Sequence, residues 1–351
     1  TRACGAATHP TARVAGETTY MGDSSDDLFD DDEHDAAGLL AACERFGFSD
    51  LLHEAPMPQS PSDYASLLAS SPEALNLGRG ELGDHGLALL SSALTVPPRG
   101  ASVRSLDIER NGLTAEGAKS LAGALRAGAV PSLEVLSLTH NAIGGDGFAA
   151  IAVSIEMGAL TELDSLDVNS NRVGDTGLIA LGKAVANGVL CKLSKLYLGG
   201  NDISDDGVIA FAAAVGTGGG DVLPALYELW LSNNEIGDKG FAALCAMLKQ
   251  GALTNLGDLR LQYNHLGDAS CSSLVGLLKC GSSLSNTWYL GLNDNAFTNE
   301  GLNVLETALA GAALPRLEFI TASSPNSTAA AQQAVQNAFT NRPRPPRPTK
   351  G

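Results

Sequence analysis

Seven asparagines recur along this chain at nearly constant spacing, and each closes the same short run of leucines. The intervals between them are 30, 30, 30, 33, 30 and 31 residues. The shared pattern is L-x-x-L-x-L-x-x-N-x-[LIV], then about four residues, then Gly and an Ala/Leu-rich stretch. A fixed period of this length indicates a solenoid of stacked units. The seven residues are Asn111, Asn141, Asn171, Asn201, Asn234, Asn264 and Asn295.

Each unit reads as a strand followed by a helix. In Leu136-x-Leu138 the apolar residues alternate, which predicts a short strand with both leucines pointing inward. Further along the unit, Leu178, Leu181 and Val185 recur at helical spacing. The pattern therefore predicts an α/β fold in which strands stack into a parallel sheet and each segment returns through a helix.

The asparagines are expected to be structural. They fall where the chain turns inward from the strand, and a buried amide that lacks hydrogen bonds costs a few kcal/mol. We therefore expect each side chain to bond neighbouring backbone groups, and we assign none of them to catalysis.

The repeats resemble those of the leucine-rich repeat superfamily over roughly residues 72–325, and in particular its long-repeat branch, typified by ribonuclease inhibitor. The resemblance implies a horseshoe solenoid with a concave parallel β-sheet and convex α-helices. It also implies an asparagine ladder between repeats. The Ran GTPase-activating proteins and the repeat domains of NOD-like receptors are similar, so regulation of a GTPase and recognition within a larger receptor remain alternative functions. Fold alone does not decide among them.

A second recurring motif precedes the helices. Asp175 and Asp238 each follow a glycine and are predicted to cap their own helices, whereas Thr114, Ser204 and Thr298 are predicted caps in other units. The second glycine of the motif is expected to let the helix pack close to the sheet.

Composition shifts divide the chain into four predicted parts. Residues 1–35 form an acidic tail, in which 23–35 hold eight acidic residues in thirteen. This run is a solubilising tail or, alternatively, a motif with Leu28 and Phe29 as anchors for a basic partner. Residues 36–71 are predicted to be a helical N-terminal cap, and 72–340 the solenoid with degenerate terminal repeats. Residues 341–351 are a Pro/Arg-rich tail or linker, or alternatively an SH3-type ligand.

Charge and cysteine content argue against several classes of function. A net charge of -17 argues against binding to nucleic acid or to an anionic membrane, and no apolar run approaches the roughly 20 residues of a membrane span. The six cysteines show no close pairs, and Cys245 and Cys271 fall in predicted helices. We therefore expect reduced thiols and a cytoplasmic protein. Residues 1–22 lack the apolar stretch of a signal peptide, so none is expected there, and Thr1 and Met21 are alternative starts.

No catalytic or ligand-binding motif stands out. There is no HExxH, GxSxG, Walker loop or CxxC pair, and the six histidines are scattered. The triple glycine at 218–220 precedes Asp221 and a strand, so a phosphate-binding loop is not predicted. We expect no enzyme activity, no cofactor, no metal and no small-molecule substrate.

The variable strand positions are the remaining candidates. In the resembled family they line the concave face. Their first half is acidic and their second half is rich in aromatic residues and arginine, the residue types that dominate binding hot spots, although strands also favour aromatics for packing alone. The sequence thus predicts a monomeric interaction scaffold for an unidentified protein partner, with exposed side chains at its centre. The candidate residues are Asp107, Glu109 and Asp167 in the first half, and Tyr197, Trp230, Arg260, Tyr263 and Tyr289 in the second.

Overall fold

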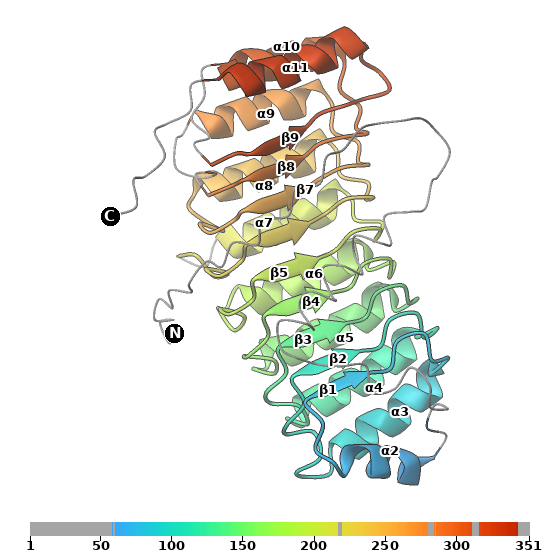
Figure 1. The fold of residues 1–351 in the computed structure, drawn as a ribbon. Helices are drawn as coiled ribbons and strands as arrows, with labels where there is room; N and C mark the ends of the chain where they lie inside the picture. The colour runs from blue at the N-terminus through green and yellow to red at the C-terminus, as the bar shows by residue number, and fades with distance from the viewer. Residues whose placement is uncertain are drawn as a thin grey trace. The chain divides into compact units, whose positions relative to one another are not determined.

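The computed structural model describes residues 58, 60–216, 220–279, 284, 286–310 and 316–342. In this part strands and helices alternate (Figure 1). The strands are β1 (Ala74–Asn76), β2 (Ser105–Asp107), β3 (Val135–Ser137), β4 (Ser165–Asp167), β5 (Lys195–Tyr197), β6 (Glu228–Trp230), β7 (Asp258–Arg260), β8 (Tyr289–Gly291) and β9 (Phe319–Thr321). The helices are α2 (Pro61–Leu68), α3 (Gly83–Leu94), α4 (Ala115–Arg126), α5 (Gly144–Glu156), α6 (Gly174–Val185), α7 (Asp205–Gly216), α8 (Asp238–Lys249), α9 (Asp268–Leu278), α10 (Asn299–Ala310) and α11 (Ala329–Asn341).

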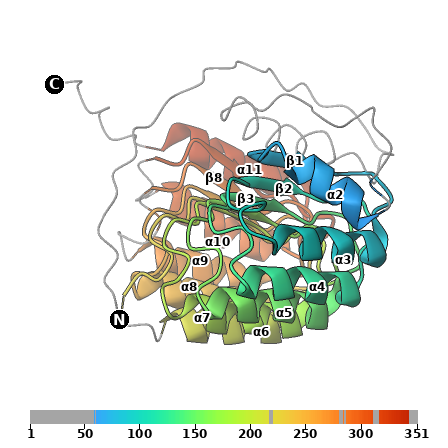
Figure 2. The ribbon, with the colours of Figure 1, turned by 90° about the horizontal axis from the view of Figure 1, so that it is seen from below.

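The strands form one parallel sheet in sequence order, β1 to β9. Register is constant, so equivalent positions of consecutive repeats are paired, as in Leu196 with Leu229 and Leu229 with Leu259. Figure 2 shows the helices along the outer side of the curved stack and the strands along its inner side. The predicted α/β solenoid is confirmed, and none of the described helices has the length and apolar character needed to cross a membrane.

The seven asparagines are buried at the end of each strand and link successive repeats. Asn201 is representative: its Oδ1 accepts hydrogen bonds from the backbone N–H groups of Asn171 and Val173 at 3.0 and 3.2 Å. Its Nδ2 donates to the carbonyl oxygens of Val168 and Gly199 at 2.9 and 3.0 Å. One side chain thus bonds four buried backbone groups, and the turn would otherwise leave the two N–H groups unpaired.

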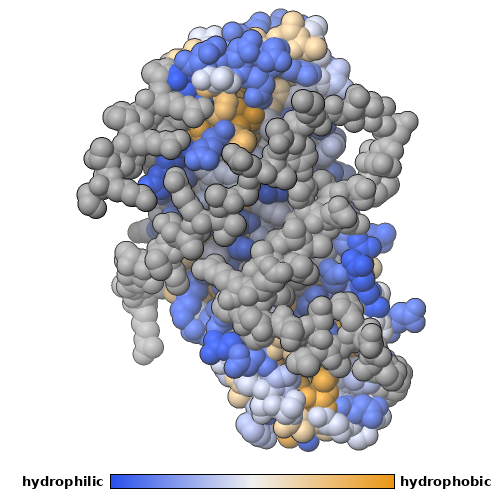
Figure 3. Space-filling model, viewed as in Figure 1, coloured by the Kyte–Doolittle hydropathy of each residue, from blue (hydrophilic) through white to orange (hydrophobic). Residues whose placement is uncertain are grey.

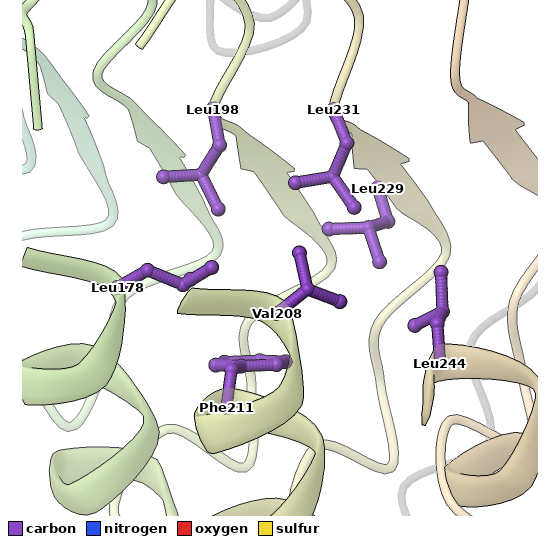
Figure 4. Close-up of a pocket in the computed structure, with 7 residues that line it drawn as sticks. All are labelled: Leu178, Leu198, Val208, Phe211, Leu229, Leu231 and Leu244. Atoms are coloured by element: carbon purple, nitrogen blue, oxygen red, sulfur yellow. The ribbon is translucent and has the colours of Figure 1, made fainter. Parts of the chain in front are cut away.

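The core lies between the sheet and the helices. In Figure 4, Leu229 of β6 points toward Val208 and Phe211 of α7. Leu198 and Leu231, which directly follow β5 and β6, point the same way. A void of about 10 Å³ remains among these apolar side chains. It is too small and too apolar to hold an ordered water, so it is a packing defect and not a binding site.

The aspartates at the helix starts connect neighbouring repeats. The prediction that Asp175 and Asp238 cap their own helices is wrong, since neither α6 nor α8 has a cap from a side chain of its own. Asp238 Oδ1 instead accepts from the N–H groups of Gly267 and Ser270, both at 2.9 Å, at the start of the next helix, α9. The stacking places each carboxylate beside the positive end of the following helix, where a negative charge is stabilising.

The second glycine of this motif makes room for that carboxylate. A Cβ at Gly240 would lie 2.6 Å from Asp205 Oδ1, and one at Gly207 would lie 2.3 Å from Asp175 Oδ1. The glycine therefore admits the aspartate of the preceding repeat, which is a different reason from the close helix–sheet packing expected from the sequence. The predicted caps Thr114, Ser204 and Thr298 do accept from N–H groups of their own helices.

Each end of the described stack has a closing helix. At the N-terminal end, α2 begins with a capping box at Ser60 and lies within the segment for which the sequence predicts a helical cap. The remaining predictions for residues 1–57, and those for Gly218 and Gly219, concern residues outside the described part of the chain. At the other end α11 closes the sheet: Gln336 Nε2 donates to the carbonyl oxygen of Ile320 in β9 at 2.8 Å.

Arg342, placed by the sequence in the Pro/Arg-rich tail, is buried against this last repeat. Its guanidinium lies 3.8 Å from the centroid of the Phe339 ring and donates to the carbonyl oxygens of Phe339 and Leu317. The closing helix and its anchor therefore extend to residue 342, beyond the predicted boundary at 340.

Candidate partner-binding surface

Three of the predicted site residues are brought together by the strand register. Tyr197 pairs with Trp230, and Trp230 pairs with Arg260, in consecutive strands β5, β6 and β7. The intervening residues Leu196 and Leu229 are buried in the core, so alternation directs the three named side chains to the opposite, inner face of the sheet. Neighbouring strands are about 4.8 Å apart, which brings these side chains into contact.

These side chains form one continuous column, which we call the aromatic stack: Tyr197, Trp230, Arg260 and Tyr289. The ring centroids of Tyr197 and Trp230 are 4.2 Å apart with an interplanar angle of 38°. The Arg260 guanidinium carbon lies 3.8 Å from the Trp230 centroid and 5.2 Å from that of Tyr289. Arg260 is thus held between two aromatic faces, a geometry that favours a cation electrostatically.

The prediction that the centre of this surface is exposed is wrong for two residues. Tyr197 is only 4% exposed and Trp230 only 7%. Their large rings cover one another, and the Arg260 guanidinium covers Trp230. The accessible side chains of the predicted group are Tyr263, which is 48% exposed, and the partly exposed Arg260 and Tyr289.

Two carboxylates that the sequence reading did not include fix the aromatic stack in place. Glu228 Oε2 accepts a 2.6 Å hydrogen bond from the Tyr197 hydroxyl. Asp258 pairs with Arg260 at 3.2 Å. Burial raises the pKa of Tyr197, and the nearby charge of Glu228 raises it further, so this phenol stays protonated. Burial also raises the pKa of Asp258 to about 6, against the lowering effect of Arg260.

A sequence signal for these carboxylates exists. Glu228 and Asp258 stand two residues before Trp230 and Arg260, and residues i and i+2 of a strand share a face. Lys195, two residues before Tyr197, completes the row, with its Nζ 3.8 Å from Glu228 Oε1. The predicted site residues all lie between or after the inner leucines, so the row of Lys195, Glu228 and Asp258, which stands before them, was not predicted.

The acidic half of the predicted site is separate from the aromatic stack and is largely engaged internally. Glu109 pairs with Arg79 at 3.0 Å. Asp167 is buried and its Oδ1 accepts from the backbone N–H of Asn169 at 3.0 Å. Asp107 accepts from the N–H of Glu109, also at 3.0 Å, and burial raises its pKa to about 6. These side chains are thus less available to a partner than an exposed acidic patch would be.

The described residues contain no group of three His, Cys, Asp or Glu side chains arranged to hold a metal ion. Cys245 and Cys271 are buried in α8 and α9 as expected, and burial raises the pKa of each thiol to about 12. Neither therefore has the thiolate character of a reactive cysteine.

Comparison with known families agrees with this architecture. A family model described as Leucine Rich repeat matches residues 101–122, 131–152, 160–182, 189–212 and 226–245. Residues 101–245 of the chain therefore carry leucine-rich repeats. Each matched segment covers a strand, its asparagine turn and the beginning of the following helix. No curated protein matches this leucine-rich repeat chain. Leucine-rich repeat domains are generally protein-interaction modules, and no partner is identified for this one.

Proposed function

We propose that this leucine-rich repeat protein is a non-enzymatic scaffold that binds a partner protein on the inner face of its sheet, at the end of the aromatic stack. The observation that carries the proposal is the fixed position of Arg260, held by Trp230, Tyr289 and Asp258. A side chain that is immobilised before binding loses little entropy when a partner docks, and arginine beside aromatic rings is typical of binding hot spots.

In this proposal the accessible residues make contact and the buried ones position them. Tyr263, Arg260 and Tyr289 offer the contact surface, whereas Tyr197 and Trp230 form the platform beneath. Trp230 Nε1 is buried without a hydrogen-bond partner among the described residues. Asp107, Glu109 and Asp167 contribute to the field that a partner meets on approach, and thereby to the association rate.

The finer assignments belong to the same proposal. A 30-residue period with a full α-helix in each unit supports the long-repeat, ribonuclease-inhibitor-like branch. The buried thiols support a reducing, cytoplasmic setting. The protein acts as a monomer and without nucleic acid, given its net charge of -17.

The test is an affinity measurement with a partner captured from the source cell. We expect Tyr263→Ala and Arg260→Lys each to weaken binding about tenfold or more, because lysine keeps the charge but cannot stack as a planar group. Met157→Ala is the matched control on the outer helices, since Met157 is 68% exposed at the end of α5. Full affinity in both inner-face variants, or equal loss in the control, contradicts the proposal.

A further inference from the structure

A second aromatic surface lies where the last strands begin. Tyr227 precedes β6, Trp288 precedes β8 and Phe319 opens β9; we call these three residues the aromatic ledge. Phe319 is 53% exposed and Tyr227 is 39% exposed. Figure 3 shows hydrophobic surface at the end of the molecule that carries β9. Isolated exposed aromatics are ordinary, but three along adjoining strands are a candidate docking surface.

The rings are arranged as a row. The centroids of Trp288 and Phe319 lie 6.0 Å apart in an edge-to-face geometry. Between β6 and β8 the equivalent residue is Gly257, and a Cβ there would lie 2.2 Å from the Tyr227 ring. The Tyr227 ring therefore lies over Gly257, and the aromatic ledge extends from β6 across β7 toward Trp288 and Phe319.

Carboxylates accompany this row. The charges that act on the Tyr227 hydroxyl are those of Glu228, Asp258 and Glu318, with Arg316 as the one cation among them. Glu318 is exposed beside Phe319 and can be reached by a ligand, whereas Asp258 is buried and paired with Arg260. A ligand for the aromatic ledge should consequently combine flat apolar groups with positive charge near Glu318.

One segment of this chain has that chemistry. Residues 343–351 read PRPPRPTKG, and they begin directly after Arg342, which is bound to the backbone of Leu317, two residues before Phe319. Arg344, Arg347 and Lys350 recur every third residue. A polyproline II helix has three residues per turn and rises about 3.1 Å per residue, so the three cations would share one face about 9 Å apart.

We propose that the aromatic ledge binds residues 343–351 of this chain as a polyproline II helix, with prolines on the rings and positive charge near Glu318. The segment would extend about 28 Å, whereas the ledge spans three strand intervals, about 14 Å, so the reach is sufficient. Docking of proline-rich segments on aromatic grooves is a general recognition mode. This inference goes beyond the proposed function, since it concerns another surface and an intramolecular ligand.

The experiment compares the full chain with a form that ends at Arg342 and so keeps its anchor. The probe is the synthetic peptide PRPPRPTKG, titrated while tryptophan fluorescence is followed, because Trp288 lies in the ledge. We expect saturable binding to the shortened form and at least tenfold weaker binding to the full chain. There the tethered segment competes at an effective concentration in the millimolar range.

Variants test the two halves of the recognition. Phe319→Ala in the shortened form should weaken peptide binding at least tenfold, and so should a peptide with alanine at 344, 347 and 350. Met157→Ala, at an exposed apolar side chain outside the ledge, should leave binding unchanged. A melting curve checks that Phe319→Ala is folded. Equal binding to the full chain and the shortened form would assign the ledge to another protein's proline-rich segment, and no binding to either would overturn the proposal.

Discussion

At the scale of single residues, buried polar groups determine this structure more than the leucines do. Any apolar side chain of suitable size fills a core position, but each asparagine turn needs an acceptor and two donors at one point. Asn201 supplies all of them, whereas the Oδ1 of Asn171 accepts no hydrogen bond among the described residues, although its Nδ2 donates to three carbonyls. The same residue type is thus unequally engaged in adjacent repeats.

This difference predicts unequal costs of substitution. Asn201→Ala leaves the N–H groups of Asn171 and Val173 without an acceptor and should lower the free energy of unfolding by about 3 kcal/mol. Asn171→Ala strands carbonyls only, which retain other bonds, and should cost about half as much. Urea denaturation of both variants measures the difference. Equal midpoints would contradict the prediction that the lost hydrogen bonds determine the loss of stability.

A second residue-scale prediction concerns Asp107. Its folded-state pKa of about 6 lies above the ordinary value of 3.8, chiefly through burial, so the folded protein holds this proton more tightly. The stabilisation from that protonated form is complete below about pH 4 and is lost as pH rises through about 6. Asp107→Asn removes the cost of the buried charge while an amide oxygen can still accept from the N–H of Glu109.

We therefore expect Asp107→Asn to be more stable than the parent at pH 7, on the order of 2 kcal/mol, and nearly equal to it at pH 4. Denaturation midpoints at several pH values give the comparison. Asp294→Asn, at an exposed position after β8, controls for the loss of one negative charge. A gain that does not vary with pH would show that desolvation of Asp107 is not its cause.

At the scale of elements, the helices are tied to one another through their first turns. Asp205 Oδ1 accepts from the N–H groups of Gly237 and Gly240, both at 2.7 Å, and so caps α8 from the start of α7. Asp238 does the same for α9. Both α8 and α9 therefore depend on the preceding helix for a cap, in addition to the packing of apolar faces.

Asp205→Asn tests this dependence between elements. The amide oxygen can still accept, but the charge that interacts with the α8 dipole is lost, so we expect a cost of about 1 kcal/mol or less. Asp205→Ala removes the acceptor as well and should cost about 1 to 2 kcal/mol. In amide hydrogen exchange the protection lost should be that of Gly237 and Gly240 at the start of α8; loss confined to α7 would mean that Asp205 serves its own helix.

At the scale of the whole molecule, sequence predicts what repeats and misses what neighbouring repeats do to one another. The constant spacing of asparagines and leucines was sufficient to predict the strands, the helices and the parallel sheet. The cross-repeat role of Asp175 and Asp238 was not predictable from one unit, because the motif reads equally well as a local cap. The burial of Tyr197 and Trp230 was missed for the same reason: each position is exposed in an isolated strand and is covered only by the next repeat's side chain.

Each repeat of a solenoid contacts only its neighbours, and the stability of the whole is a sum over adjacent units. Destabilisation of the last repeat should therefore affect nearby repeats more than distant ones. Arg342 joins the closing helix to β9, and Arg342→Ala would remove its bonds to Leu317 and Phe339. The thiols Cys271 in α9 and Cys245 in α8 report on progressively more distant repeats, and both are buried. In native-state labelling with a thiol reagent we expect both to react slowly in the parent and Cys271 to accelerate more than Cys245 in Arg342→Ala. Equal acceleration of the two would mean that the repeats open together as one cooperative unit, and the anchor would then act on global unfolding and not on fraying of the last repeats.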